Sequence, residues 1–211
     1  MSNSDNKETS VTSLSYKDLR EKVKPGDVIV FSTTDIPSNV VKLATKSHYV
    51  HVAIVHSVYP GDDTPDSILI AESHIDTSLP SVGRGDYKIG VQLQWLWARL
   101  KSQDGLAWWA PLKTPLTNEG LSKMQAWLYK IEKEGISYDF VQAVGVGLDS
   151  FFGNIGLKNT TDDSALFCSE LVTRALQIAG VVDDSINASG LTPGKVMEFT
   201  CFQETILIKE K

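Results

Sequence analysis

The sequence is poor in cysteine, in positive charge and in long apolar runs. Only two cysteines occur among 211 residues, Cys168 and Cys201, so the chain has no disulfide framework. It carries 20 basic and 26 acidic residues, for a net charge of −6, and it has no basic stripe that would favour nucleic acid as a partner. No stretch approaches about 18 uninterrupted apolar residues, the length typical of a transmembrane segment. We therefore expect a globular protein without a membrane span and without a nucleic-acid partner.

The first residues of the chain differ in composition from the rest. Segment 1–15 is polar, lacks the apolar stretch of a secretory signal, and predicts a disordered leader. The remaining segment, 16–211, predicts a single domain, because domains contain about 100–200 residues. A chain of this kind is expected to be cytoplasmic as synthesised, and only a dedicated secretion system would export it.

Clusters of β-branched residues predict strands, and helical periodicity predicts helices. The strands are expected at 28–31, 51–55, 68–72, 106–111 and 202–208, the second and third forming a hairpin across the loop 59–67. The helices are expected at 36–46, at 117–134 with Thr117 as N-cap, at 138–149, at 164–180 with Ser164 as N-cap, and after Thr192-Pro193. Strands and one helix precede further helices and a last strand, an order that predicts an α+β fold.

Cys168 belongs to the apolar stripe of the predicted helix 164–180. The other members of the stripe are Leu171, Val172, Ala175, Leu176 and Ala179. Because this stripe must face the sheet, Cys168 is expected to point inward. A place in the first helical turn would favour its thiolate through the helix dipole and would let its backbone N–H stabilise an oxyanion. The competing interpretation is a small apolar core residue.

A histidine that can act as a base would favour the catalytic interpretation of Cys168. Of the four histidines, His51 is the best candidate, because it begins a predicted strand. If the hairpin turns near Gly61-Asp62, Glu72 falls opposite His51 and orients its imidazole. His48 remains an alternative base. The spacing His48-x-x-His51 also suggests a zinc site. On a strand, however, positions three apart face opposite sides, so no metal is predicted.

Six short motifs occur in an order that places histidine well before cysteine. They are Pro25-Gly26-Asp27-Val28-Ile29-Val30-Phe31, Ser47-His48-Tyr49-Val50-His51-Val52-Ala53-Ile54-Val55, Ile70-Ala71-Glu72, Tyr138-Asp139-Phe140, Phe167-Cys168-Ser169-Glu170-Leu171-Val172 and Leu191-Thr192-Pro193-Gly194. The ordered set resembles the circularly permuted branch of the NlpC-type, papain-like cysteine hydrolases. That branch includes YiiX-like proteins and the lecithin:retinol acyltransferase group.

The resemblance implies a fold and a reaction. The fold would be a small antiparallel, barrel-like sheet with the nucleophile-bearing helix packed on it. The reaction would use Cys168 as nucleophile, His51 as base and Glu72 as the third member, with no cofactor. It implies an amidase or endopeptidase, with peptidoglycan peptides as one substrate class, or a lipid or thioester acyl hydrolase or acyltransferase. Without a signal peptide, an antibacterial effector with an immunity protein as partner is a further expectation. An inactive binding module is the alternative outside the enzymes.

Tryptophan is concentrated in one short segment. Four of the five tryptophans lie within 95–109, and Trp108 and Trp109 are adjacent, so in a strand they face opposite sides. We expect at least one tryptophan of this segment to line the active site, and we predict Trp108, Trp109 and Tyr138 as substrate-binding residues. The competing interpretation is that these large rings fill the core.

Overall fold

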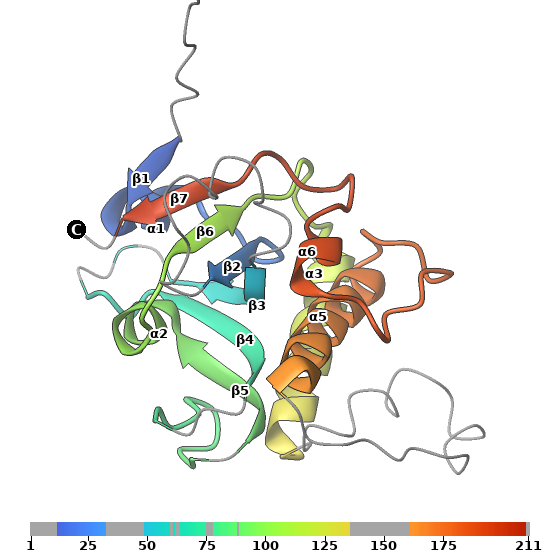
Figure 1. Cartoon of the computed structure of the whole chain (residues 1–211), viewed down its shortest axis with the longest axis horizontal. Coiled ribbons are helices and arrows are strands. Elements are labelled where there is room, and N and C mark those ends of the chain that lie inside the picture. The colour runs from blue at the N-terminus through green and yellow to red at the C-terminus, as the bar shows by residue number, and fades with distance from the viewer. Residues whose placement is uncertain are drawn as a thin grey trace, which may run out of the picture.

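The computed structural model describes residues 12–32, 49–59, 61, 64–74, 78–87, 89–135 and 161–209. Seven strands form one sheet in the order β1-β7-β6-β2-β3-β4-β5 (Figure 1). They are β1 (Ser13–Ser15), β2 (Val28–Ser32), β3 (Tyr49–Val58), β4 (Ile68–His74), β5 (Gly90–Trp95), β6 (Ala107–Ala110) and β7 (Ile206–Lys209). The helices are α1 (Tyr16–Lys22), α2 (Leu96–Ser102), α3 (Asn118–Lys133), α5 (Thr161–Ile178) and α6 (Pro193–Val196).

This architecture confirms the α+β class and corrects the expected shape of the sheet. The sheet is open, with β1 and β5 as its two edges, whereas a closed barrel requires its edge strands to pair with each other. It is also mixed, because β1 runs parallel to β7 while the other pairs are antiparallel. The expected antiparallel, barrel-like sheet is therefore wrong for the described part of the chain.

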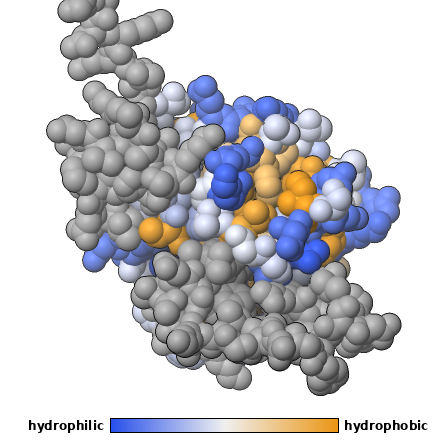
Figure 2. Space-filling view, turned by 45° about the vertical axis from the view of Figure 1, so that its right-hand side comes forward, coloured by the Kyte–Doolittle hydropathy of each residue, from blue (hydrophilic) through white to orange (hydrophobic). Residues whose placement is uncertain are grey.

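The two faces of the sheet bury two separate cores. In β2, Val28 and Val30 face one core and Ile29 and Phe31 face the other, as the two-residue period of a strand requires. The first core is closed by α3, α5 and α6, and the second by α1 and α2, on the other side of the sheet (Figure 1). Each fully buried aliphatic side chain stabilises the fold by about 1.5–3 kcal/mol. Figure 2 brings the right-hand side of Figure 1, with α3, α5 and α6, toward the viewer and shows apolar side chains among hydrophilic ones.

Two predicted helix starts are confirmed and one is wrong. The hydroxyl of Thr117 accepts a hydrogen bond from the N–H of Gly120 at the start of α3, and Thr192 caps α6 with Pro193 in its first turn. Helix α5 instead begins at Thr161, so Ser164 lies inside it and is not its cap. The predicted helices 36–46 and 138–149 lie outside the described residues.

The ordered domain begins earlier than the sequence predicts. Ser13–Ser15, expected at the end of a disordered leader, form β1, whose backbone pairs with β7. Helix α1 follows directly and buries Tyr16 and Leu19 in the second core. The chain is thus anchored by backbone pairing and by apolar burial, neither of which the polar composition of the segment reveals. Among the described helices, none combines the length and the apolar character that crossing a bilayer requires.

Candidate active site

His51 lies near the start of β3 and faces Glu72 of the neighbouring strand β4. Both side chains are buried, with His51 7% and Glu72 1% exposed. Nε2 of His51 lies 2.6 Å from Oε2 of Glu72, a distance at which the imidazole N–H donates a short hydrogen bond to a carboxylate. The pair that the hairpin hypothesis proposed is therefore in contact.

The register that brings the pair together differs from the predicted one. The ladder pairs Ile54 with Ala71 and Val55 with Ile70, a shift of two residues from the register that would set His51 opposite Glu72. A shift of one residue would have moved Glu72 to the other face of the sheet, but a shift of two leaves it on the same face. His51 and Glu72 therefore meet diagonally across the two strands.

Cys168 reaches the same imidazole from α5. Its side chain is fully buried, and it shares a side-chain hydrogen bond with His51. Because Nε2 of His51 already donates to Glu72, Nδ1 is the nitrogen that remains for the thiol. One imidazole thus connects a thiol on one side with a carboxylate on the other.

The place of Cys168 within its helix corrects an expectation. The residue lies about two turns inside α5, because the helix begins at Thr161. The helix dipole acts within the first turn, and a backbone N–H in the helix interior bonds to the carbonyl four residues earlier. The expected first-turn position is therefore wrong, and the dipole effect and the oxyanion role of the Cys168 N–H lose their basis. Within the described site, His51 is the group that can activate the thiol.

The electrostatics of the site favour a protonated His51 and an ionised Glu72. Burial lowers the pKa of His51, but Cys168 and Glu72 together outweigh it and raise this pKa to about 9. Burial by itself would raise the pKa of Glu72, but the charge of Arg99 and the hydrogen bond from His51 hold this pKa well below its ordinary value. At neutral pH the imidazole is therefore protonated and the carboxylate ionised.

Arg99 and His74 complete the site, and the sequence analysis missed both. Arg99, 5% exposed in α2, donates from Nε to Oε2 of Glu72 at 3.1 Å and from Nη2 to Nε2 of His74 at 2.7 Å. A guanidinium only donates, so Nε2 of His74 is the acceptor in this contact. Arg99 also stacks over the ring of Phe31, 5.5 Å from its centroid. No motif marks Arg99, because α2 itself was not predicted.

The same cluster has the donor types of a metal site. His51, Glu72 and His74 offer ligand atoms that all lie within 4.8 Å of one another. However, the guanidinium of Arg99 donates to both Glu72 and His74, so a fixed cation already uses the lone pairs that a metal ion would need. We therefore interpret the cluster as a hydrogen-bonded acid–base group.

Of the three predicted substrate-binding residues, the structure describes Trp108 and Trp109. Trp109 is 6% exposed in the second core, and its indole N–H donates to Asp27. Trp108 is 7% exposed and packs edge-on against Tyr49, two residues before His51 in the chain. The burial of Trp109 is typical of a core side chain. Tyr138 and His48 lie outside the described residues.

His56 lies away from this cluster. It contacts the hydroxyl of Ser57 and the backbone carbonyl of Gln125, and burial lowers its pKa.

In comparisons with known proteins, no family model matches the chain, and no curated protein matches it significantly.

Proposed function

We propose that this protein is a cysteine hydrolase that cleaves an amide bond in a peptide-like substrate. The observation that carries the proposal is the hydrogen bonding of one buried imidazole, His51, to both Cys168 and Glu72. The three residues come from β3, β4 and α5, which are separated in sequence. A thiol, a base and a group that orients the base are the components that covalent acyl transfer requires.

The reaction proceeds in two steps. The thiolate sulfur of Cys168 attacks the carbonyl carbon, while the proton it has given up is held at Nδ1 of His51, whose imidazole is protonated at neutral pH. The C–N bond then breaks, and the imidazolium returns the proton to the departing amine, which leaves a thioester. In the second step the neutral His51 takes a proton from water, the resulting hydroxide attacks the thioester, and the C–S bond breaks to return the Cys168 thiolate beside the protonated imidazole.

Glu72 and Arg99 act on this reaction through His51. The carboxylate accepts the Nε2–H of His51, fixes the tautomer and stabilises the imidazolium formed when the thiol loses its proton. The guanidinium of Arg99 keeps that carboxylate ionised in a buried position. Since the Glu72–Arg99 hydrogen bond uses the oxygen that also accepts from His51, both donors fix the orientation of the carboxylate.

The proposal extends to the permuted NlpC-type, papain-like family. The base precedes the nucleophile in the chain, and the helix bearing the cysteine packs against the strands bearing the histidine and the carboxylate. Peptidoglycan peptides, and a role as an exported antibacterial effector, belong to the same proposal. The open sheet is the feature that departs from the expected family fold.

Mass spectrometry of reaction products tests the proposal. The protein would be incubated separately with peptidoglycan fragments, with a mixed peptide library and with phospholipids, beside the Cys168→Ala variant. We expect new amine and carboxylate termini from one of the amide substrates with the wild-type protein alone. Release of fatty acid from the phospholipids, with no cleaved amide, would show an acyl hydrolase instead. Equal products from wild type and variant would refute the assignment of Cys168 as the nucleophile.

A further inference from the structure

The guanidinium of Arg99 divides one of its edges between two acceptors. Its Nε–H and Nη2–H groups point the same way, and this edge binds both oxygens of one carboxylate in the usual bidentate pair. Here Nε donates to Oε2 of Glu72 at 3.1 Å, whereas Nη2 donates to Nε2 of His74 at 2.7 Å. Arg99 therefore bonds to Glu72 through one oxygen, the same oxygen that accepts from His51.

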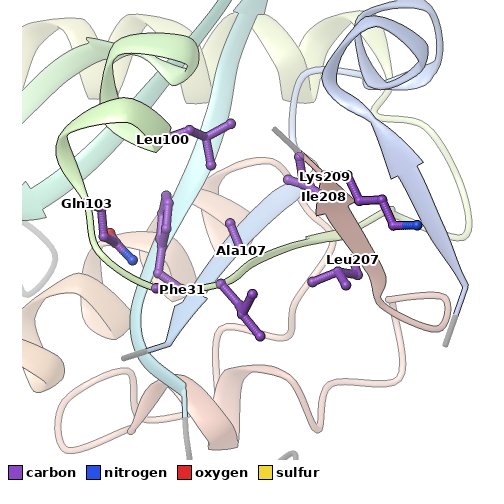
Figure 3. Close-up of a pocket in the computed structure, with 9 residues that line it drawn as sticks. Phe31, Leu100, Gln103, Ala107, Leu207, Ile208 and Lys209 are labelled. Carbon is purple, nitrogen blue, oxygen red and sulfur yellow. The ribbon is translucent and has the colours of Figure 1, made fainter. Parts of the chain in front are cut away.

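The other sides of the guanidinium are held by residues that do not contact this edge. Nη1 donates to the hydroxyl of Ser102 at 3.3 Å, and the guanidinium lies over the Phe31 ring, 5.5 Å from its centroid. Figure 3, a view of the cavity of about 440 Å³ that Phe31 also lines, shows this side chain extending from the sheet toward α2. Ser102 and Phe31 thus support Arg99, while His74 is the contact that fixes Nη2.

His74 is placed beside the pair by the strand that carries Glu72. The two residues are two positions apart in β4, so both side chains lie on the face of the sheet that α2 covers. The His74 ring also meets the His51 ring edge-on, with the centroids 4.7 Å apart and an angle of 86° between the planes. His74 therefore contacts two of the groups around the carboxylate, Arg99 on one side and the base His51 on the other.

Loss of the acceptor on His74 would change how Arg99 binds Glu72. Nη2 would then be a donor without its partner beside a carboxylate, and a guanidinium and a carboxylate pair best when two parallel hydrogen bonds join them. Rotation into that arrangement turns the carboxylate and moves Oε2 away from the Nε2–H of His51. The fold would keep its buried ion pair, but the base would lose part of its orientation.

We propose that His74 is a positioning residue of the active site, which holds Arg99 in a one-oxygen contact with Glu72 and so keeps this carboxylate aligned on His51. Its effect on turnover rests on the proposed function, whereas the arrangement of the four side chains is independent of that function. His74 acts through Arg99 and Glu72, and it exchanges no proton with the substrate.

The proton between His51 and Glu72 reports this arrangement without any turnover. Its short N···O distance of 2.6 Å shifts the proton resonance strongly downfield in NMR, and the absence of the resonance in His51→Gln identifies it. We expect His74→Phe, which keeps a ring but lacks the acceptor, to move this resonance upfield. His74→Gln, whose Oε1 can accept from Nη2 of Arg99, should keep it near the wild-type position. An unchanged resonance in folded His74→Phe protein would overturn the proposal.

Turnover measures the consequence for catalysis. With an amide substrate, we expect His74→Phe to lower kcat by about 10- to 100-fold, the scale of a small misplacement of a catalytic group, and to leave KM unchanged. His74→Gln should recover most of kcat. Urea unfolding should give both variants nearly wild-type stability, because the Arg99–Glu72 ion pair persists. His74→Leu also lacks an acceptor and serves if His74→Phe does not fold.

His56→Leu is the matched control for both measurements. It removes a buried histidine whose partners are Ser57 and Gln125, outside the cluster, so the folded variant should keep kcat and the downfield resonance. Loss of the resonance in this control as well would show that the signal does not depend on the acceptor of His74, and would overturn the proposal.

The two measurements separate the positioning role from the proposed function. A resonance shifted in His74→Phe and restored in His74→Gln, with no amide hydrolysed by wild type, would overturn the hydrolase and support the positioning role. An equal loss of kcat in both variants would overturn the positioning role and leave the hydrolase. A loss of stability in His74→Phe as large as that in Arg99→Met would overturn it too, because His74 would then hold the fold rather than the orientation of the base.

Discussion

Arg99 donates a 3.1 Å hydrogen bond to Oε2 of Glu72, the same carboxylate oxygen that lies 2.6 Å from His51. One buried oxygen thus accepts from a guanidinium and an imidazole. A buried carboxylate costs several kcal/mol of desolvation, so it remains ionised only where such partners offset that cost. The acid–base chemistry attributed to β3 and α5 therefore depends on a residue of α2.

Replacement of Arg99 should expose that dependence. Arg99→Met leaves Glu72 buried with His51 as its partner, so we expect the pKa of Glu72 to rise and the free energy of unfolding at pH 7 to fall by about 3–5 kcal/mol. Urea unfolding measures the loss. Arg99→Lys keeps the positive charge and should recover part of the lost free energy of unfolding.

Arg20→Met is the matched control for that experiment. The Nε of Arg20 donates to the hydroxyl of Ser67, a neutral partner at 2.8 Å, so its loss should cost about 0.5–1.5 kcal/mol. Equal losses for the two arginine variants would show that Arg99 does not compensate a buried charge.

The buried histidines His51 and His56 should differ in whether their loss affects turnover or only stability. His51→Ala should abolish turnover and slow the alkylation of Cys168, because the thiol loses its base. His56→Ala removes a buried imidazole that contacts Ser57 and Gln125, so it should lower the melting temperature while turnover by the folded protein persists. His48→Ala should also keep most of the activity. Loss of turnover in His48→Ala together with retained turnover in His51→Ala would show that His48, and not His51, is the base.

The two cysteines should differ in reactivity. Burial raises the pKa of Cys201 to about 11, so little of its thiolate exists at neutral pH. Cys168 has an imidazole as hydrogen-bond partner, and iodoacetamide at pH 7 should label it much faster than Cys201. Peptide mapping by mass spectrometry after short exposure measures both rates. Equal labelling in the folded protein would contradict the role of Cys168.

Protonation of His51 should make both stability and turnover depend on pH. The folded-state pKa of about 9 lies above the ordinary value of 6.5, so the stabilising contribution is complete below pH 6.5 and is lost as pH rises through 9. Urea unfolding of wild type and His51→Gln between pH 5.5 and 10 should show the difference shrinking across that window.

Turnover should fall on the alkaline side over the same range, because the departing amine needs the proton of the imidazolium. The dependence of kcat/KM on pH measures this limb. The pKa of Glu72 is lowered instead, so its contribution is complete above pH 4.5 and is lost only as pH falls through the depressed value. A stability difference that grows above pH 9 would contradict the assignment to His51.

Local patterns predicted the candidate catalytic residues but not their exact arrangement. His51 and Glu72 were paired from a hairpin hypothesis whose register was wrong by two residues, and their contact survived because an even shift keeps side chains on one face. The predicted start of α5 at Ser164 was wrong, since the helix begins three residues earlier, at Thr161. Serine and threonine are both residue types that begin helices well. Two adequate start signals, three residues apart, cannot be ranked locally.

The amino-acid sequence was enough to predict the α+β class, the caps of α3 and α6, a histidine in a strand and a thiol in a helix. Each of these features depends on neighbours within a few residues. The tertiary structure alone decided that the sheet stays open, that Arg99 reaches Glu72, and that His74 shares the same edge of the guanidinium. These features depend on which strands pair and on how α2 packs across them. Such long-range contacts leave no periodic signal in the chain, since the burial of a charge and the sharing of its hydrogen bonds are settled only when distant segments meet.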